Sequence, residues 1–207
     1  MSFAQRERGA LVVSMAEIGP DAPTLCGEWT VRDLAAHLVI RERRPDASPG
    51  ILISALAGYT EGVRRKAAQR PFTELLEQVR EGPPIWSPMK PLDAAVNLTE
   101  MFVHHEDVRR GTPGWEPRVL DPSDEAKLWT VVKKMARMSY RKSTVSIVLE
   151  KPDGEQVTVT RPSDRSVTLR GPASELLLHA FGRNEVRLET SGAGADVEAV
   201  MKLDRSV

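Results

Sequence analysis

The sequence predicts an α+β protein, in which an up-down four-helix bundle at residues 1–120 precedes a small α+β domain at residues 121–207. Two observations predict this division. Apolar residues recur at a helical period in the first part, where loops rich in proline and glycine separate the helical segments. Beyond residue 121, short segments alternate between apolar and polar residues, which is typical of the strands of a mostly antiparallel sheet.

Capping signals mark where the first two helices begin. Ser2 and Gln5 have the spacing of a capping box, and Thr30 and Asp33 repeat it before a second apolar run. Short loops make antiparallel neighbours of successive helices, so an up-down bundle is the simplest arrangement. The four helices of the bundle are expected at residues 2–18, 30–44, 51–70 (continued as a short helix at 72–80) and 93–110.

The second domain is expected to mix strands and helices. Pro152-Asp153-Gly154 lies between two alternating segments and predicts the turn of a hairpin. A leucine-rich segment follows the third alternating segment and predicts a buried helix. The strands are expected at residues 144–150, 156–160, 166–169 and 186–189, and the helices at residues 124–138, 172–181 and 194–203.

Composition excludes several classes of partner. The chain has 29 Lys and Arg residues and 29 Asp and Glu residues, and it lacks a basic block with interleaved aromatics, so nucleic acid is not expected as a partner. No apolar run is long enough for a membrane span or a signal peptide, so a cytoplasmic protein without membrane contact is expected. Cys26 is the single cysteine, which fits a reducing compartment.

Residues 93–110 place polar groups along the middle of an apolar helix face. At about 100° per residue, these groups fall within an arc of roughly 80°. Burial of such groups costs several kcal/mol unless they form hydrogen bonds or bind an ion. A metal site or a buried ion-pair network with an arginine of a neighbouring helix would account for the stripe. Its members are Asp93, Asn97, Glu100, His104 and Asp107.

Spacing selects the candidate ligands within this stripe. Glu100 and His104 are four residues apart, so both side chains could reach one ion, whereas His105 points about 100° away. Asp107 lies one turn further on and could orient the imidazole of His104. His37, on the flank of the second helix, is either a third ligand or a hydrogen-bonded boundary residue.

Two segments together resemble the mycothiol-dependent maleylpyruvate isomerase family, which belongs to the DinB-like metal-binding bundles. Residues 25–38 read Leu-Cys-Gly-Glu-Trp-Thr-Val-Arg-Asp-Leu-Ala-Ala-His-Leu, and residues 99–108 read Thr-Glu-Met-Phe-Val-His-His-Glu-Asp-Val. The resemblance implies a bundle in which a histidine of the second helix and an E-x-x-x-H pair of the fourth hold one divalent metal. The match falls on His37, Glu100 and His104, and implies zinc, with nickel or another divalent ion as the alternative.

The resemblance extends more weakly to residues 167–201, which are similar to the smaller C-terminal domain of the family. In the isomerase, an arginine of that domain reaches the cleft, which implies a substrate contact for Arg183. The alternative is that Arg183 only caps the C-terminus of a predicted helix, because it directly follows Gly182 at the end of that helix.

Three protein ligands leave one position of a tetrahedral metal open. The family resemblance implies that a low-molecular-weight thiol such as mycothiol occupies it and attacks an electrophilic substrate, as in an isomerase or an S-transferase. The alternative function is a non-catalytic metal-containing binding or sequestering module, with the second domain as a small apolar carrier. Helix-mediated assembly is a third function. The substrate and the oligomeric state are not readable.

Three other side chains have simpler interpretations. Cys26 lies in a loop without a basic neighbour in sequence, so a packed thiol is expected rather than a nucleophile. Trp29 is expected to staple the start of the second helix, and His179 is expected to be a packed residue of a leucine-rich helix.

Overall fold

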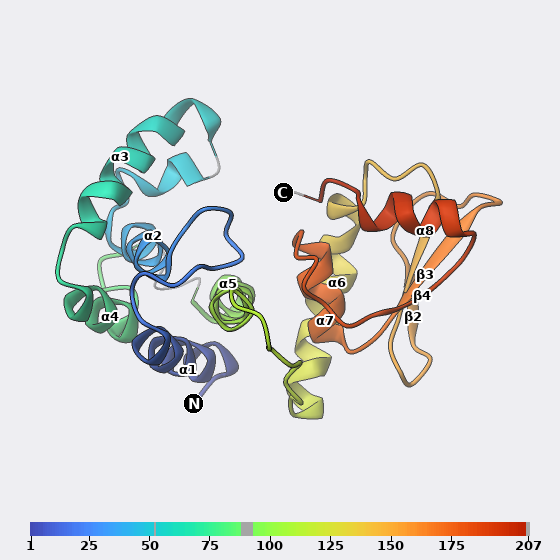
Figure 1. The fold of residues 1–207 in the computed structure, drawn as a ribbon, viewed down its shortest axis with the longest axis horizontal. Coiled ribbons are helices and arrows are strands. Elements are labelled where there is room, and N and C mark those ends of the chain that lie inside the picture. The colour runs from blue at the N-terminus through green and yellow to red at the C-terminus, as the bar shows by residue number, and fades with distance from the viewer. Residues whose placement is uncertain (52, 88–92, 206–207) are drawn as a thin grey trace. The chain divides into compact units, whose positions relative to one another are not determined.

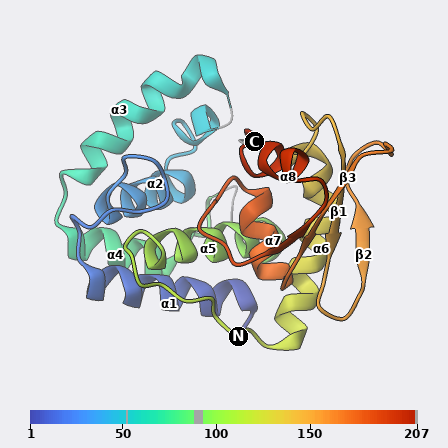
Figure 2. The same cartoon turned by 45° about the vertical axis from the view of Figure 1, so that its right-hand side comes forward.

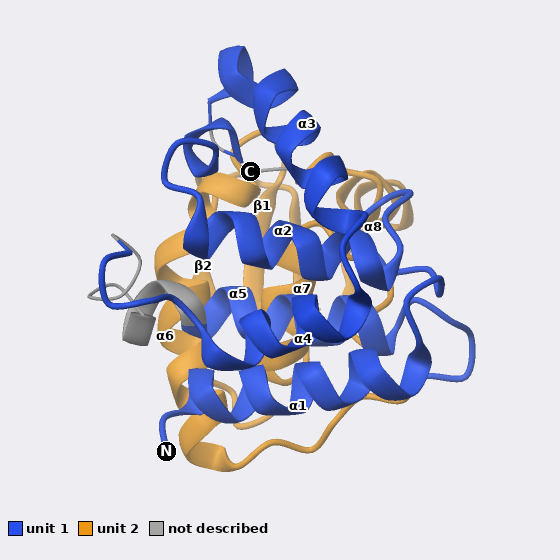
Figure 3. Cartoon of the chain, turned by 90° about the vertical axis from the view of Figure 1, so that its left-hand side faces the viewer, with its two compact units in different colours: residues 1–115 blue, residues 116–207 orange. Residues whose placement is uncertain are grey.

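The computed structural model describes residues 1–51, 53–87 and 93–205, and the side chains of residues 93–97 also lie outside the described part. The chain divides into two compact units, Met1–Trp115 and Glu116–Val207, which are coloured separately in Figure 3. The first unit is helical and the second combines helices with a four-stranded sheet, so the expected α+β class is confirmed. No helix among the described residues has the length and apolar character needed to cross a bilayer.

The helices α1, α2, α4 and α5 form the bundle core of the first unit (Figures 1 and 2). Helix α1 packs against α4 and α5, and α2 packs against α3 and α4. Apolar side chains of these helices, such as Met15, Leu34, Leu75 and Met101, are fully buried in this core. The α-helices among the described residues of this unit are α1 (Phe3–Ile18), α2 (Val31–Arg43), α3 (Ala57–Ala68), α4 (Phe72–Glu81) and α5 (Asp93–Arg109).

Both expected capping boxes are present. The Ser2 side chain accepts a hydrogen bond from the Gln5 backbone N–H, and the Gln5 side chain accepts one from the Ser2 N–H. Thr30 and Asp33 make the same reciprocal pair at the start of α2. Because these bonds satisfy orphan donors of the first helical turn, they fix where α2 begins and therefore where its histidine lies along the bundle.

The expected continuous helix over residues 51–70 is wrong in its first part. Short 3-10 turns lie there, and α3 begins only at Ala57. The physical reason is a close approach of the preceding segment to α3. A Cβ atom on Gly50 would lie 2.0 Å from Thr60 Oγ1, and Thr60 Oγ1 donates a hydrogen bond to the Ala47 carbonyl at 2.5 Å. This contact folds the chain back on itself and prevents a continuous helix.

The second unit contains three helices and a mixed sheet in its described residues. The strand order is β2-β1-β3-β4, in which β1 and β3 are parallel and the two outer pairs are antiparallel, so the mostly antiparallel sheet is confirmed. Helix α6 packs against α7. The elements are α6 (Pro122–Ser139), β1 (Ser146–Glu150), β2 (Gln156–Thr158), β3 (Ser166–Arg170), α7 (Ala173–Ala180), β4 (Glu189–Ser191) and α8 (Gly194–Met201).

The fourth strand lies later than the expected residues 186–189. Pairing with β3 begins at Glu189 and continues to Ser191. The preceding backbone is held by a side chain instead of a strand, because the Arg187 N–H donates to Glu175 Oε2 at 2.8 Å. Alternation of apolar residues at 186–189 therefore does not reflect a strand.

His179 is a fully buried residue of α7, as expected, and it lies in a polar contact inside the second unit. Its Nδ1 is 2.6 Å from the Tyr140 hydroxyl, and its Nε2 has no hydrogen-bond partner among the described residues. Burial, with a smaller effect of the nearby Arg205 charge, lowers the pKa of His179 to about 3. His179 is therefore neutral in the fold, and the Tyr140 hydroxyl donates to its Nδ1.

We predict that this neutral histidine makes the second unit sensitive to acid. The folded pKa of about 3 lies below the unfolded value of about 6.5, so between these values the unfolded chain binds the proton more readily. The free energy of unfolding should fall, by a few kcal/mol, as pH decreases through this window. Denaturant unfolding between about pH 7 and about pH 4 measures it.

The variant His179→Gln provides the control, because glutamine can accept a hydrogen bond from Tyr140 and does not titrate. Its stability should depend less on pH than that of the unmodified protein. Equal pH dependence in the two proteins would contradict this assignment.

Candidate metal centre

Three of the side chains expected to bind a metal lie together in the first unit. His37 comes from α2, and Glu100 and His104 come from successive turns of α5. Their candidate ligand atoms all lie within 4.8 Å of one another. Glu100 Oε1 is 3.2 Å from His104 Nε2 and 3.6 Å from His37 Nε2. The helical spacing of four residues and the packing of the bundle therefore bring the three side chains to one place.

This donor set fits a tetrahedral metal. Zinc binds histidine nitrogen and carboxylate oxygen at about 2.0–2.2 Å, so neighbouring ligand atoms at tetrahedral angles are separated by roughly 3.3–3.5 Å. The two contacts of Glu100, at 3.2 and 3.6 Å, bracket that separation. The histidine side chains are only 10 to 13% exposed and that of Glu100 is 23% exposed. The Glu100 carboxylate therefore lies at a suitable separation from the ligand nitrogens of both His37 and His104.

Arg41 also contacts the candidate carboxylate. Its Nε lies 3.2 Å from Glu100 Oε1, and the residue is buried on α2 one turn after His37. Burial would raise the pKa of Glu100, but hydrogen bonds with His104 and His37 and the Arg41 charge outweigh burial and hold that pKa well below its ordinary value. Glu100 is thus an anion at neutral pH. The site therefore contains the three candidate metal ligands and also an ion pair between Glu100 and Arg41, which the alternative interpretation, a buried ion-pair network, requires.

The other edge of the His104 imidazole faces Asp107. The distance from His104 Nδ1 to Asp107 Oδ2 is 2.9 Å, and Asp107 is fully buried. A carboxylate in this position favours the Nδ1–H tautomer and leaves Nε2 directed at Glu100, which is the common arrangement behind a metal-bound histidine. Burial would lower the pKa of His104, but hydrogen bonds with Asp107, Cys26 and Glu100 outweigh burial and raise that pKa well above its ordinary value.

The neighbouring His105 has different partners. Its Nδ1 lies 2.9 Å from Glu7 Oε2, and its Nε2 lies 3.1 Å from Ser14 Oγ. Both partners belong to α1. His105 therefore joins α5 to α1, and the helical angle that favoured His104 over His105 agrees with this placement.

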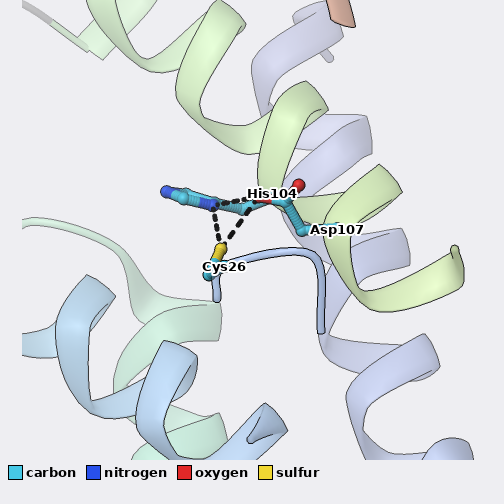
Figure 4. A group of neighbouring side chains, drawn as sticks. All are labelled: Cys26, His104 and Asp107. Atoms are coloured by element: carbon cyan, nitrogen blue, oxygen red, sulfur yellow. Dashed lines mark hydrogen bonds and ion pairs between the residues drawn. The ribbon is translucent and has the colours of Figure 1, made fainter. Parts of the chain in front are cut away.

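Two residues near the candidate centre were assigned only packing roles from sequence. Cys26 Sγ lies 3.1 Å from Asp107 Oδ2 and 3.8 Å from His104 Nδ1, as Figure 4 shows. The ring of Trp29 lies 5.1 Å from the ring of His37, measured between centroids. Their position in the sequence could have indicated that they lie near the centre, because both residues belong to the segment that leads directly into the helix of His37.

Asp93, Asn97 and Arg183 are the other sequence candidates. The side chains of Asp93 and Asn97 lie outside the described part of the chain. Arg183 belongs to the second unit, where its guanidinium donates a hydrogen bond to the Phe181 carbonyl at 2.6 Å. Its expected contact with a substrate stays a prediction.

Comparison with known proteins agrees with the resemblance. Residues 4–82 match the family model of the mycothiol maleylpyruvate isomerase N-terminal domain, which supports the resemblance for this part of the chain. The matched segment includes His37 and ends before Glu100 and His104. Searches of curated proteins and of solved structures found no match to the chain.

We predict that substitution of any of the three candidate ligands removes the metal. His37→Ala, Glu100→Ala and His104→Ala should each weaken zinc or cobalt binding by roughly 100-fold or more, because loss of a ligand costs more than loss of its supporting partner. Metal analysis of the purified proteins and competition with a chelator measure the change.

His105→Gln is the matched control on the adjacent position, and it should retain the metal because His105 contacts Glu7 and Ser14. Full metal retention by both His37→Ala and Glu100→Ala would contradict the centre and favour the ion-pair network.

We further predict that metal binding competes with a proton on His104. The raised pKa of His104 means that the metal-free imidazole keeps its second proton to a higher pH than an ordinary histidine does. A metal must displace the Nε2 proton, so affinity should rise by up to about tenfold per pH unit from the acid side until the pH reaches the raised pKa of His104. Calorimetry in buffers of different ionisation enthalpy counts the released protons. An affinity that is constant over this range would contradict the assignment.

Proposed function

We propose that this protein is a metal- and thiol-dependent enzyme in which His37, Glu100 and His104 bind one divalent ion, zinc. The convergence of these three donors, with Asp107 behind His104, is the observation that carries the proposal. The match of residues 4–82 to the family model of the mycothiol maleylpyruvate isomerase N-terminal domain supports it. The proposed second reactant is a low-molecular-weight thiol, such as mycothiol.

Three protein ligands would leave one position of a tetrahedral ion for this thiol. A bound zinc ion would supply a lower thiol pKa, and therefore more of the nucleophilic thiolate, at neutral pH. The protein's own groups do the positioning. Asp107 holds the proton on His104 Nδ1, and Arg41 holds the Glu100 carboxylate through its Nε. The proposed chemistry is addition of the thiol sulfur to one carbon of an activated alkene, which forms a C–S bond, breaks the C=C π bond and leaves the electron pair on the conjugated carbonyl. Rotation about the new single bond and loss of the thiol would complete an isomerisation, whereas protonation of carbon would retain the C–S bond.

The second candidate function is a metal-containing binding module without turnover. The contact of Arg41 with Glu100 supports it, because a carboxylate that pairs with a buried arginine has a structural partner besides the ion. For the carrier role of the second unit, the relevant feature is a cavity of about 420 Å³ near β3, which is lined by Pro152, Gly171, Pro172 and Leu188 together with Arg170, Arg187 and Glu189. The leucines Leu176, Leu177 and Leu178 are fully buried in the core.

We predict that a small thiol binds directly at the candidate centre. In cobalt-substituted protein, mycothiol should shift the d–d absorption bands, because sulfur would enter the metal's coordination sphere. The same protein should accelerate reaction of the thiol with maleylpyruvate or with another activated alkene. Absorption titration and product analysis measure the two effects.

Cys26→Ser serves as a control, because it removes the only protein thiol and should leave the response to added mycothiol in place. Glu100→Ala should abolish both effects. A protein that binds cobalt in full but responds to neither mycothiol nor cysteine would favour the binding module.

A further inference from the structure

The short loop between α1 and α2 contacts both helices that carry the candidate ligands. Thr24 and Trp29 close it, since Thr24 N and Thr24 Oγ1 donate to the Trp29 carbonyl at 3.2 and 2.8 Å. Inside it, the Cys26 N–H donates to Thr24 Oγ1 at 3.2 Å and the Trp29 N–H donates to the Cys26 carbonyl at 3.2 Å. Cys26 is therefore held in a defined position by hydrogen bonds on both sides.

This loop is attached to the end of α5. The Leu25 N–H donates to the Asp107 carbonyl at 3.1 Å, so loop and helix share a backbone hydrogen bond. Further along, Gly111 permits close contact, because a Cβ atom there would lie 2.2 Å from the Pro23 carbonyl oxygen. These backbone contacts place Cys26 beside the Asp107 side chain.

Two side chains donate hydrogen bonds to one carboxylate oxygen, Asp107 Oδ2. His104 Nδ1 lies at 2.9 Å and Cys26 Sγ lies at 3.1 Å, and Figure 4 shows them converging on the same residue. A fully buried carboxylate is costly unless donors satisfy it, and a neutral thiol can donate without adding charge. With both donors in place, Asp107 Oδ2 is fixed on the Nδ1 side of the imidazole.

The Trp29 end of the same loop contacts His37. Trp29 packs against His37 on one side, and the Arg64 guanidinium lies over the Trp29 ring at 4.8 Å from its centroid. Arg64 is in turn paired with Asp33 at 2.5 Å. The loop therefore contacts His37 through Trp29 and His104 through Cys26 and Asp107.

We propose that Cys26 is a positioning residue of the metal centre. Its thiol donates to Asp107 Oδ2 and holds that carboxylate on His104 Nδ1, so that His104 Nε2 faces Glu100 and His37. This inference rests on the proposed metal centre and extends it to a residue that does not bind the ion.

A direct ligand role for Cys26 is the competing interpretation, because Cys26, His104 and Asp107 also form a cluster of potential donors within 4.8 Å. In that case His104 would bind through Nδ1 and lose its bond to Asp107. The hydrogen-bond interpretation is favoured, since the 2.9 Å and 3.1 Å contacts satisfy the buried carboxylate without an ion.

We predict that Cys26→Ala weakens cobalt or zinc binding by about tenfold, at the lower end of the cost of losing a partner of a metal-bound histidine. Cys26→Ser keeps a donor and should bind within about threefold of the unmodified protein. In the zinc form, the His104 Nδ1–H resonance should exchange with water faster in Cys26→Ala than in the other two proteins.

Ser14→Ala is the matched control, because it removes a hydrogen bond to the neighbouring His105 without touching the loop or Asp107. It should bind metal within about threefold of the unmodified protein. The proposal is overturned if Cys26→Ala binds normally, if Cys26→Ser is as weak as Cys26→Ala, or if Ser14→Ala matches that weakness. A sulfur-to-cobalt charge-transfer band that disappears in Cys26→Ser would also overturn it, in favour of direct ligation.

These outcomes are separate from failure of the metal centre. If His37→Ala retains all of its cobalt, the proposed centre is wrong whatever Cys26 does. If His37→Ala loses cobalt while Cys26→Ala binds it normally, the centre stands and only the role of Cys26 is wrong.

Discussion

The first unit depends on the satisfaction of polar groups that α5 places inside a helical bundle. An unpaired buried carboxylate or imidazole would cost several kcal/mol, a large part of the stability of a domain this size. Glu100 is satisfied by His37, His104 and Arg41, and Asp107 is satisfied by His104 and Cys26. Each partner comes from α2, from the loop before it or from α5 itself. The positions of α2 and of the loop before it therefore depend on the hydrogen bonds and ion pairs that the polar face of α5 requires.

Local signals in the sequence were sufficient for the features that depend on one helix. The capping boxes at Ser2 and Thr30, and the spacing that separates His104 from His105, follow from helical geometry alone. The break before α3 depends on contact between Gly50 and Thr60, which no local pattern reveals. The shift of β4 similarly depends on a side chain of α7.

Prediction of the centre was limited for the same reason. Residue spacing could place Glu100, His104 and Asp107 on one face, and the family resemblance added His37. The contact of Cys26 with Asp107 requires a folded loop and a backbone hydrogen bond between residues 82 positions apart, Leu25 and Asp107. A cysteine without a basic neighbour in sequence gave no indication that its partner would be an acid on another helix.

The charges of the centre bear on what its open position would accept. The carboxylates of Glu100 and Asp107 face the Arg41 guanidinium and the His104 imidazole, whose raised pKa favours its protonated form, so in the metal-free state two carboxylates would oppose two cationic groups. A divalent metal would add two charges and displace the His104 proton, which leaves this group with one excess positive charge. A buried site disfavours an uncompensated charge, so an anionic fourth ligand would be preferred over a neutral one. A thiolate supplies that charge, and the argument holds whether the chain transfers the thiol or only binds it.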